Sequence, residues 1–215
     1  MKNNCLINRL GLLGIVSLLS FTAMVVFAPL AYPGYDWRSQ AVSDLGAMNA
    51  PSLALSNQLS ALHGPCGIVC VMMVCIAIQG RLNKTLRVGI YACVAMNWLT
   101  GVGYAMFPLS ESGFANTFQD WMHGAVTVAV VLLSVLSLVL IMVGGYRKRQ
   151  FVSLAIWATV SLAGMLTGAI GVGAAPQEYF GILERVSLFA ATGFNAVLGI
   201  YLFTGRIDCP GIPTV

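Results

Sequence analysis

The sequence predicts an all-α integral membrane bundle of six transmembrane helices, with the N- and C-termini cytoplasmic. Composition is the first observation, because 58% of the 215 residues are hydrophobic and 8% are charged, whereas soluble domains are about 25% charged. Distribution is the second, because the apolar residues form six long runs and most basic residues fall between alternate runs. A soluble chain of this composition would expose large apolar patches to water, and a bilayer removes that cost.

Each apolar run is long enough to cross a bilayer, which requires about 20 predominantly apolar residues. The first run follows Lys2 and Arg9. It exceeds the roughly 7–15 apolar residues of a signal peptide and lacks a small-x-small cleavage motif, so we predict a retained anchor helix. We expect one transmembrane domain over residues 1–215. Its predicted helices cover residues 10–31, 58–80, 88–107, 121–145, 151–172 and 182–203.

Positive charge predicts which side faces the cytoplasm, because cytoplasmic loops carry an excess of Lys and Arg. Nine of the 11 basic residues fall on one side of the predicted spans: Lys2, Arg9, Arg81, Lys84, Arg87, Arg147, Lys148, Arg149 and Arg206. The opposite side carries the long loop 32–57 and most of the acids. We therefore predict a multi-pass protein of the plasma (cytoplasmic) membrane with this loop outside. The net charge of +4 is dispersed in short clusters, which does not indicate a nucleic-acid partner.

Small and polar residues predict how the helices pack. The fifth helix carries Gly164, Gly168 and Gly171, which favour close approach of a neighbour, so we place this helix at the bundle centre. Asn97 and Asn195 are predicted to form hydrogen bonds between helices. The fourth run is rich in Val, Leu and Ile and is expected to face lipid. No CxxC motif occurs, so the cysteines in the apolar runs are expected to be reduced.

Ionisable residues gather near the outer ends of the second, fourth and sixth helices: His63, Asp120, His123, Glu184 and Arg185. Such residues are costly in a bilayer and face the bundle or water. His63 is predicted roughly 7 Å deep, and Pro65 falls in the first two turns, where its missing N–H costs least. We expect the five side chains to converge in one outward-facing pocket, roofed by residues 36–47. That loop would contribute the ligand-binding residues Asp36, Arg38, Ser43 and Asp44.

Charge pairing within this pocket is the reason to expect convergence. Glu184 and Arg185 are adjacent, so they point about 100° apart on a helix and cannot neutralise each other. Each therefore needs a partner from another element. The expected partners are Asp36, Asp44 or Asp120 for Arg185, and Arg38, His63 or His123 for Glu184.

These residues are compatible with a purely structural role, in which Glu184 or Asp120 pairs with Arg185 or Arg38, the histidines bond to loop carbonyls, and the first outer loop is tied to the bundle. Three functions are also compatible with such a pocket. We expect binding of a membrane lipid or of a membrane-protein partner at the outer leaflet. The alternative is a metal-dependent lipid hydrolase with catalytic candidates Asp44, Asp120, His123 and Glu184; zinc would be held by His63, Asp120, His123 and Glu184. Ser43 or Asp44 would assist proton transfer or orientation, although no HExxH motif occurs. The third function is a cofactor protein, with haem between His63 and His123, or copper(I) at His63, Cys66 and Cys70.

Three motifs resemble those of a known family. AVSDLGAMNAP follows the first run, FP followed by an acid and then His123 marks the start of the fourth, and GILERVSLFA opens the sixth. The chain is similar over nearly its whole length to the Domain of Unknown Function 998 family. The resemblance implies a small six-helix membrane protein without an established activity, and it singles out Asp44, Asp120, His123, Glu184 and Arg185. In FPLSES, Glu111 stands further from the proline than the acid of the family pattern.

Overall fold

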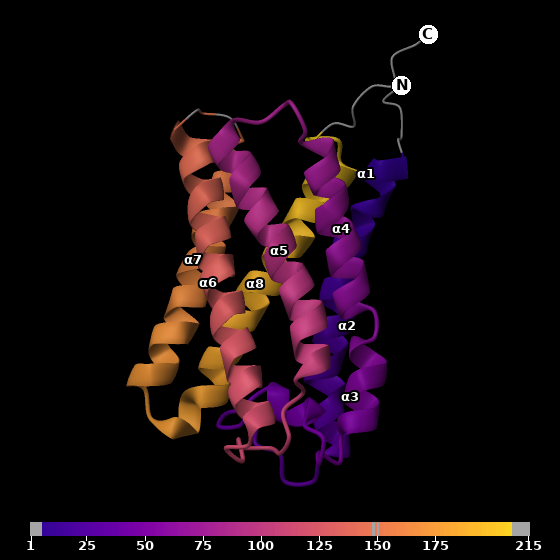
Figure 1. Ribbon diagram of the computed structural model, residues 1–215, viewed down its shortest axis with the longest axis vertical. Coiled ribbons are helices and arrows are strands. Elements are labelled where there is room, and N and C mark those ends of the chain that lie inside the picture. Colours follow the sequence, from indigo (N-terminus) through magenta and orange to yellow (C-terminus); the bar gives the residue numbers. More distant parts are fainter. Residues whose placement is uncertain (1–5, 148, 150, 208–215) are drawn as a thin grey trace.

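The computed structural model describes residues 6–147, 149 and 151–207, and it confirms an all-helical bundle (Figure 1). Six helices are long and apolar enough to cross a membrane: Leu6–Ala31, Leu53–Ala77, Lys84–Met106, Phe118–Arg147, Val152–Ala174 and Gln177–Phe203. No strand occurs among the described residues. The first and last helices have their terminal ends on the same side of the bundle, as an even number of spans requires (Figure 1).

The first two spans are each built from more than one helical segment. The first consists of α1 (Leu6–Leu10), α2 (Leu12–Phe27) and the 3-10 helix η1 (Ala28–Ala31), and the second consists of α3 (Leu53–Ser60) and α4 (His63–Ala77). The middle spans are single helices: α5 (Lys84–Met106), α6 (Phe118–Arg147) and α7 (Val152–Ala174). In the sixth, η3 (Gln177–Tyr179) leads into α8 (Phe180–Phe203), while η2 (Ser43–Gly46) lies in the first outer loop.

The second span differs most from the sequence prediction, because it begins at Leu53 and is interrupted at residues 61–62. Pro65 accounts for the interruption, since it has no N–H to donate to the carbonyl four residues earlier. Pro65 does lie in the first turn of α4, as predicted, but α4 forms only part of the span. The preceding segment, α3, is tied to α2, because the hydroxyl of Ser20 donates to the carbonyl of Leu59 at 2.6 Å.

The centre of the bundle is occupied by α8, which packs against α2, α4 and α7. Ten of its 24 residues are buried, against six of 23 in α7, so the prediction that α7 lies at the centre is wrong. The glycines of α7 do permit close packing, because a Cβ at Gly168 would overlap the carbonyl of Leu183 and the side chain of Ser187 in α8. They serve one face only, since Trp157 and Val160 of α7 are exposed.

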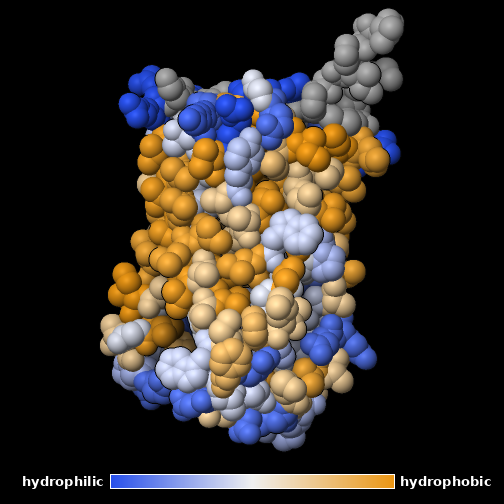
Figure 2. Space-filling view, in the orientation of Figure 1, coloured by the Kyte–Doolittle hydropathy of each residue, from blue (hydrophilic) through white to orange (hydrophobic). Residues whose placement is uncertain are grey.

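The surface has the polarity that a bilayer requires. Figure 2 shows a broad apolar band between two polar ends. On α6, Val128, Leu132 and Leu136 are exposed within this band, as expected for a helix facing lipid. The chain is therefore a multi-pass membrane protein by the length, the composition and the exposed surface of its helices.

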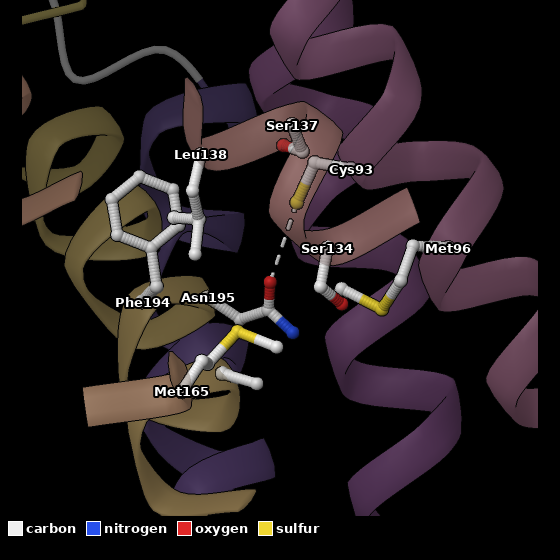
Figure 3. Close-up of a pocket in the computed structure, with 9 residues that line it drawn as sticks. Cys93, Met96, Ser134, Ser137, Leu138, Met165, Phe194 and Asn195 are labelled. Carbon is white, nitrogen blue, oxygen red and sulfur yellow. Dashed lines mark hydrogen bonds between the residues drawn. The ribbon is translucent and has the colours of Figure 1, made fainter. Parts of the chain in front are cut away.

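A pair of asparagines joins α5 to α8, as the sequence predicted. Nδ2 of Asn195 donates to Oδ1 of Asn97 at 2.9 Å, and Nδ2 of Asn97 donates to Oδ1 of Asn195 at 3.3 Å. Sγ of Cys93 also donates to Oδ1 of Asn195, at 3.5 Å (Figure 3). The adjoining cavity between α5, α6, α7 and α8 measures about 10 Å³, which is space for one water molecule at most. This region is a packed polar contact and not a ligand site.

Candidate functional site

Two loops fold together over one end of the bundle, at the bottom of Figure 1. We call residues 32–52 and 107–117 the outer cap, after the side on which the charge pattern predicts them. The N–H of Met48 donates to the carbonyl of Leu109 at 2.9 Å and joins the two loops. Ala47 and Ala50 pack with Leu109 in a small buried cluster between them. The cap is therefore one packed unit.

Asp44 is a buried acid that links both parts of the outer cap. Its Oδ1 accepts a hydrogen bond from the N–H of Gly113 at 3.0 Å, and its Oδ2 accepts one from the N–H of Ala41 at 3.0 Å. The hydroxyl of Ser112 donates to the backbone carbonyl of Asp44 at 3.2 Å. Backbone donors from two loops thus satisfy this carboxylate. Ser43 precedes it at the start of η2.

Arg185 of α8 reaches into a cage of three carbonyls, two from the outer cap and one from its own helix. Its Nη1 donates to the carbonyls of Trp37, Gln40 and Gly181 at 2.8, 3.1 and 2.8 Å. A Cβ at Gly181 would collide with the first two carbonyls, so only glycine permits this approach. The expected carboxylate partners of Arg185 are not its hydrogen-bond partners. The irregular backbone of the cap leaves the carbonyls of Trp37 and Gln40 without a helical N–H donor, and these carbonyls accept from the guanidinium instead.

Tyr35 completes the cage around Arg185. Its hydroxyl accepts a hydrogen bond from Nη2 of Arg185 and donates to the carbonyl of Ala41 at 2.7 Å. Burial raises the pKa of Tyr35 from 10.0 to about 12, although the nearby guanidinium acts in the opposite direction. The phenol therefore stays protonated at neutral pH and keeps both roles. Tyr35 does not stand out in the sequence, because an aromatic residue in a loop has no periodicity that distinguishes it.

Only one carboxylate oxygen of Glu184 accepts a hydrogen bond from the outer cap. Its Oε2 accepts a hydrogen bond from the N–H of Val42 at 2.6 Å. This confirms that the first outer loop supplies a partner, but the partner is a backbone amide and not Arg38, His63 or His123. A hydrogen bond from a backbone N–H to a carboxylate supplies part of the stabilisation that a cation was expected to provide.

Asp120 lies in the first turn of α6, and its side chain caps the start of this helix. Its carboxylate accepts hydrogen bonds from the N–H and hydroxyl of Ser110, both at 2.8 Å, and from the N–H of Thr117 at 3.2 Å. The hydroxyl of Thr117 accepts in return from the N–H of Asp120 at 3.2 Å. This reciprocal pair is a capping box. Asp120 is fully buried, so it organises the second outer loop rather than facing a ligand.

His63 lies deeper than predicted and on a different side of the bundle. It follows Leu53, the start of its span, by ten residues, which is roughly 15 Å along a helix. Nδ1 of His63 lies 3.1 Å from the hydroxyl of Ser17 in α2, and that hydroxyl donates to the carbonyl of His63 at 2.7 Å. Its ring packs on Phe21 at 5.0 Å between centroids. Because the span begins at Leu53 rather than at residue 58, His63 lies five residues further along it than predicted.

His123 lies between α5 and α6. Its Nδ1 is 2.9 Å from the carbonyl of Phe107. A carbonyl only accepts, so Nδ1 carries the proton, and Nε2 of the neutral ring is an acceptor. The ring packs on Tyr104 at 4.9 Å between centroids. The hydroxyl of Tyr104 donates to Oγ1 of Thr127 at 3.1 Å, and the charge of Glu184 has a smaller effect on Tyr104 than its burial and this hydrogen bond have. We call Tyr104, His123 and Glu184 the polar triplet.

Two acceptor atoms of the polar triplet remain open. Within the described part of the chain, neither Nε2 of His123 nor Oε1 of Glu184 has a hydrogen-bond partner. Neither atom is among the fully buried side-chain atoms that lack a partner, so both have accessible surface. Tyr104 was not singled out from the sequence, since it resembles any aromatic residue at the end of a spanning helix. The triplet is the strongest candidate site in this half of the bundle.

The remaining loop residues act within the cap. Asp36 is exposed and accepts hydrogen bonds from the hydroxyl of Ser39 at 2.7 Å and the N–H of Arg38 at 3.1 Å. These two bonds hold the pKa of Asp36 below its usual value. Arg38 lies over the ring of Tyr179 at 5.8 Å. Both residues shape the loop and its contact with η3.

The expected single pocket is therefore divided among separate places. His63 belongs to α2 and α4, Asp120 to the second outer loop, and Arg185 to the first. Among the described residues, no three His, Cys, Asp or Glu side chains come together in a way that could hold a metal ion. Cys70, a candidate copper ligand, is buried with its thiol 3.7 Å from the carbonyl of Gly11. Of the residues expected in the pocket, the described structure shows the ring of His123 in contact with Tyr104, while Glu184 of α8 is bonded to the first outer loop.

These features define a six-helix, multi-pass membrane protein whose outer loops form one packed cap. Its sequence over residues 15–201 matches the model of a family described as Protein of unknown function (DUF998), and the chain belongs to that family. The resemblance noted in the motifs is thereby confirmed. Comparisons with curated proteins and with solved structures find no match.

Proposed function

We propose that the protein binds the headgroup of a membrane lipid beneath the outer cap, through the polar triplet. The observation that carries this proposal is the pair of open acceptors, Nε2 of His123 and Oε1 of Glu184. Both residues lie within two turns of the outer ends of their spans. A polar atom without a partner at this depth costs several kcal/mol in hydrocarbon, on the order of 2–7. A ligand that donates hydrogen bonds removes this cost.

The chemistry of the triplet supports an amine-bearing headgroup. Glu184 supplies a negative charge and His123 supplies a second acceptor, while the hydroxyl of Tyr104 is already directed to Thr127. A primary ammonium group offers positive charge and three N–H donors. Phosphatidylethanolamine carries such a group, whereas the trimethylated amine of phosphatidylcholine has no N–H. We therefore expect the protein to distinguish these two lipids.

Binding is favoured over the zinc-dependent hydrolase by where the other candidate ligands lie. The carboxylate of Asp120 accepts hydrogen bonds within the capping box. His63 is hydrogen-bonded to Ser17, on the side of the second span that faces α2. Of the four candidate zinc ligands, only His123 and Glu184 belong to the polar triplet and have an acceptor atom there without a hydrogen-bond partner. Lipid binding needs no more than these residues and the protein's own hydrogen bonds.

The test compares lipid adducts by native mass spectrometry of the full chain in neutral detergent. Phosphatidylethanolamine is expected to bind more tightly than phosphatidylcholine with equal acyl chains. Glu184→Gln retains an acceptor for the N–H of Val42 but removes the charge, so it should weaken phosphatidylethanolamine binding about tenfold while the cap stays folded. Glu178→Gln removes an exposed acid at the same end and should have no effect. Equal binding of the two lipids, or full binding by Glu184→Gln, would show the proposal to be wrong.

A further inference from the structure

The break in the second span lies inside the hydrocarbon layer and on the surface of the bundle. The span Leu53–Ala77 has its middle at residue 65, and the break at residues 61–62 is close to it. In a centred span these residues lie roughly 5–6 Å from the midplane, well inside the hydrocarbon, which extends about 15 Å to each side. Ala61 and Leu62 are exposed, and Figure 1 shows α3 and α4 at the edge of the bundle, away from α6 and α7.

Backbone groups at this break lack partners within the chain. Pro65 has no N–H for the carbonyl of Ala61, and this carbonyl accepts no other hydrogen bond from the described residues. The N–H groups of residues 62–64 likewise have no acceptor there. On the side toward α2, serine hydroxyls satisfy neighbouring carbonyls. Irregular backbone that faces lipid is costly, and membrane proteins tolerate it where protein or water covers it.

Two amide side chains extend this polar region toward the outer surface. Asn57 and Gln58 are exposed and have no hydrogen-bond partner within the described part of the chain. They lie about one turn further out than the break. The exposed residues of the span follow each other at steps of one, three or four, which places them on one side of the helix. We call this side the second-span face: Ala54, Asn57, Gln58, Ala61, Pro65, Val69, Met72 and Ile76.

The chemistry of the second-span face suits a second copy of the same chain. Acyl chains offer no hydrogen bonds at this depth, whereas a carboxamide both donates and accepts. Two identical faces related by a two-fold axis along the membrane normal bring each amide to its counterpart at the same depth. No Asp, Glu, Lys or Arg occurs between residues 45 and 80, so the two copies bring no like charges together. Ala54, Ala61 and Gly64 are small, and a Cβ at Gly64 would meet nothing within 4 Å, which leaves room for a close neighbour.

We propose that the second-span face is the interface of a homodimer within the membrane. The amides of Asn57 and Gln58 pair across the two-fold axis, and each copy shields the broken backbone of the other from lipid. Gln58 of one copy lies within one turn of the Ala61 carbonyl of the other and can donate to it. This interface is separate from the polar triplet and does not depend on the function proposed there.

The first experiment places a photoreactive side chain on this face. Leu62→benzoylphenylalanine replaces a residue that is 55% exposed, and Leu132→benzoylphenylalanine on α6, 64% exposed, is the matched control. The full chain is irradiated in liposomes of phosphatidylethanolamine and phosphatidylglycerol. The Leu62 variant alone should give a covalent dimer on a denaturing gel. Equal dimer yields from both variants, or adducts of the Leu62 variant with lipid alone, would overturn the proposal. In cell membranes, adducts with a different protein and none with a second copy would overturn it as well.

The second experiment measures the dimer fraction by counting photobleaching steps of the labelled full chain as it is diluted in liposomes. Asn57→Leu with Gln58→Leu should weaken the dimer about tenfold, because amide pairs between membrane helices contribute to association by this order. The monomer should stay folded, since leucine suits a position that faces lipid. Gln177→Leu removes an exposed amide at the same end but outside the face and should leave the dimer unchanged.

A third variant tests the broken backbone and guards against misfolding of the double variant. Pro65→Ala restores the N–H that the carbonyl of Ala61 lacks, so a second copy is no longer needed to cover this acceptor, and the dimer should again be weakened. A dimer fraction that neither Pro65→Ala nor the double amide variant changes would contradict the proposed interface. A chain that remains monomeric at every protein density would do the same.

Discussion

A hydrogen bond of 2.8 Å from Arg185 to the carbonyl of Trp37 joins α8 to the outer cap across 148 positions of sequence. The same guanidinium also binds the carbonyls of Gln40 and Gly181 and the hydroxyl of Tyr35. One buried side chain thus replaces the helical partners that the backbone of residues 35–41 lacks. This makes Arg185 the main attachment between the first outer loop and the central helix.

Loss of Arg185 should release the cap. Arg185→Gln removes most of the donors from several buried acceptors, so we expect a loss of about 3–5 kcal/mol in the free energy of unfolding. Limited proteolysis in detergent should then cut within residues 32–52. Arg38→Gln is the control, because Arg38 is exposed on the same loop and contacts only the Tyr179 ring. Equal protease resistance of the two variants would contradict this role.

The Asn97–Asn195 pair should show coupled energetics. Each single change to Leu leaves one buried amide without its partner, while the double change leaves none. Amide pairs between membrane helices contribute about 1–2 kcal/mol, so each single variant should lose roughly that amount of stability. The double variant should be more stable than the sum of the two losses predicts. Additive losses, measured by thermal unfolding in detergent, would show that the two amides act independently.

Close packing between α7 and α8 makes Gly168 intolerant of a side chain. A Cβ there would overlap the Leu183 carbonyl and Ser187, so Gly168→Leu should force the helices apart and lower the yield of folded protein. Val128→Leu on α6 adds one methylene at a position that is 60% exposed and should leave the yield unchanged. The measurement is the monodisperse fraction after gel filtration together with thermal stability. Equal values for both variants would contradict the packing seen here.

The direction of insertion is predicted from charge and is tested directly by reporter fusions. Fusions after Lys84 and after Arg147 should report the cytoplasm, and a fusion after Glu111 should report the outside. The structure places the segments around Lys84 and Glu111 at opposite ends of α5. A cytoplasmic signal from Glu111 together with an outside signal from Lys84 would show that the bundle is inserted in the opposite direction.

The hydrogen-bond partners that the structure shows for the charged residues could not be predicted from the sequence, which indicated charge pairs instead. Glu184 and Arg185 were selected as residues that need partners, because a charge at membrane depth is costly, and Asp44 was among the partners expected for Arg185. Their partners are backbone groups of Ala41, Val42 and Trp37. Every residue has such groups, so no pattern in the sequence marks the ones that lack a helical or turn partner.

The sequence by itself determined the class of the protein and its six spans. In a bilayer each spanning segment must satisfy its own backbone by forming a helix, so helix number follows from local composition. The sequence also indicated that Asn97 and Asn195 form hydrogen bonds between helices, although it did not show that they bond to each other. Tertiary structure decided the rest: the break before His63, the central place of α8, and the division of the expected pocket. These depend on how distant segments pack, and Tyr104 belongs to the candidate site only because folding placed its ring against that of His123.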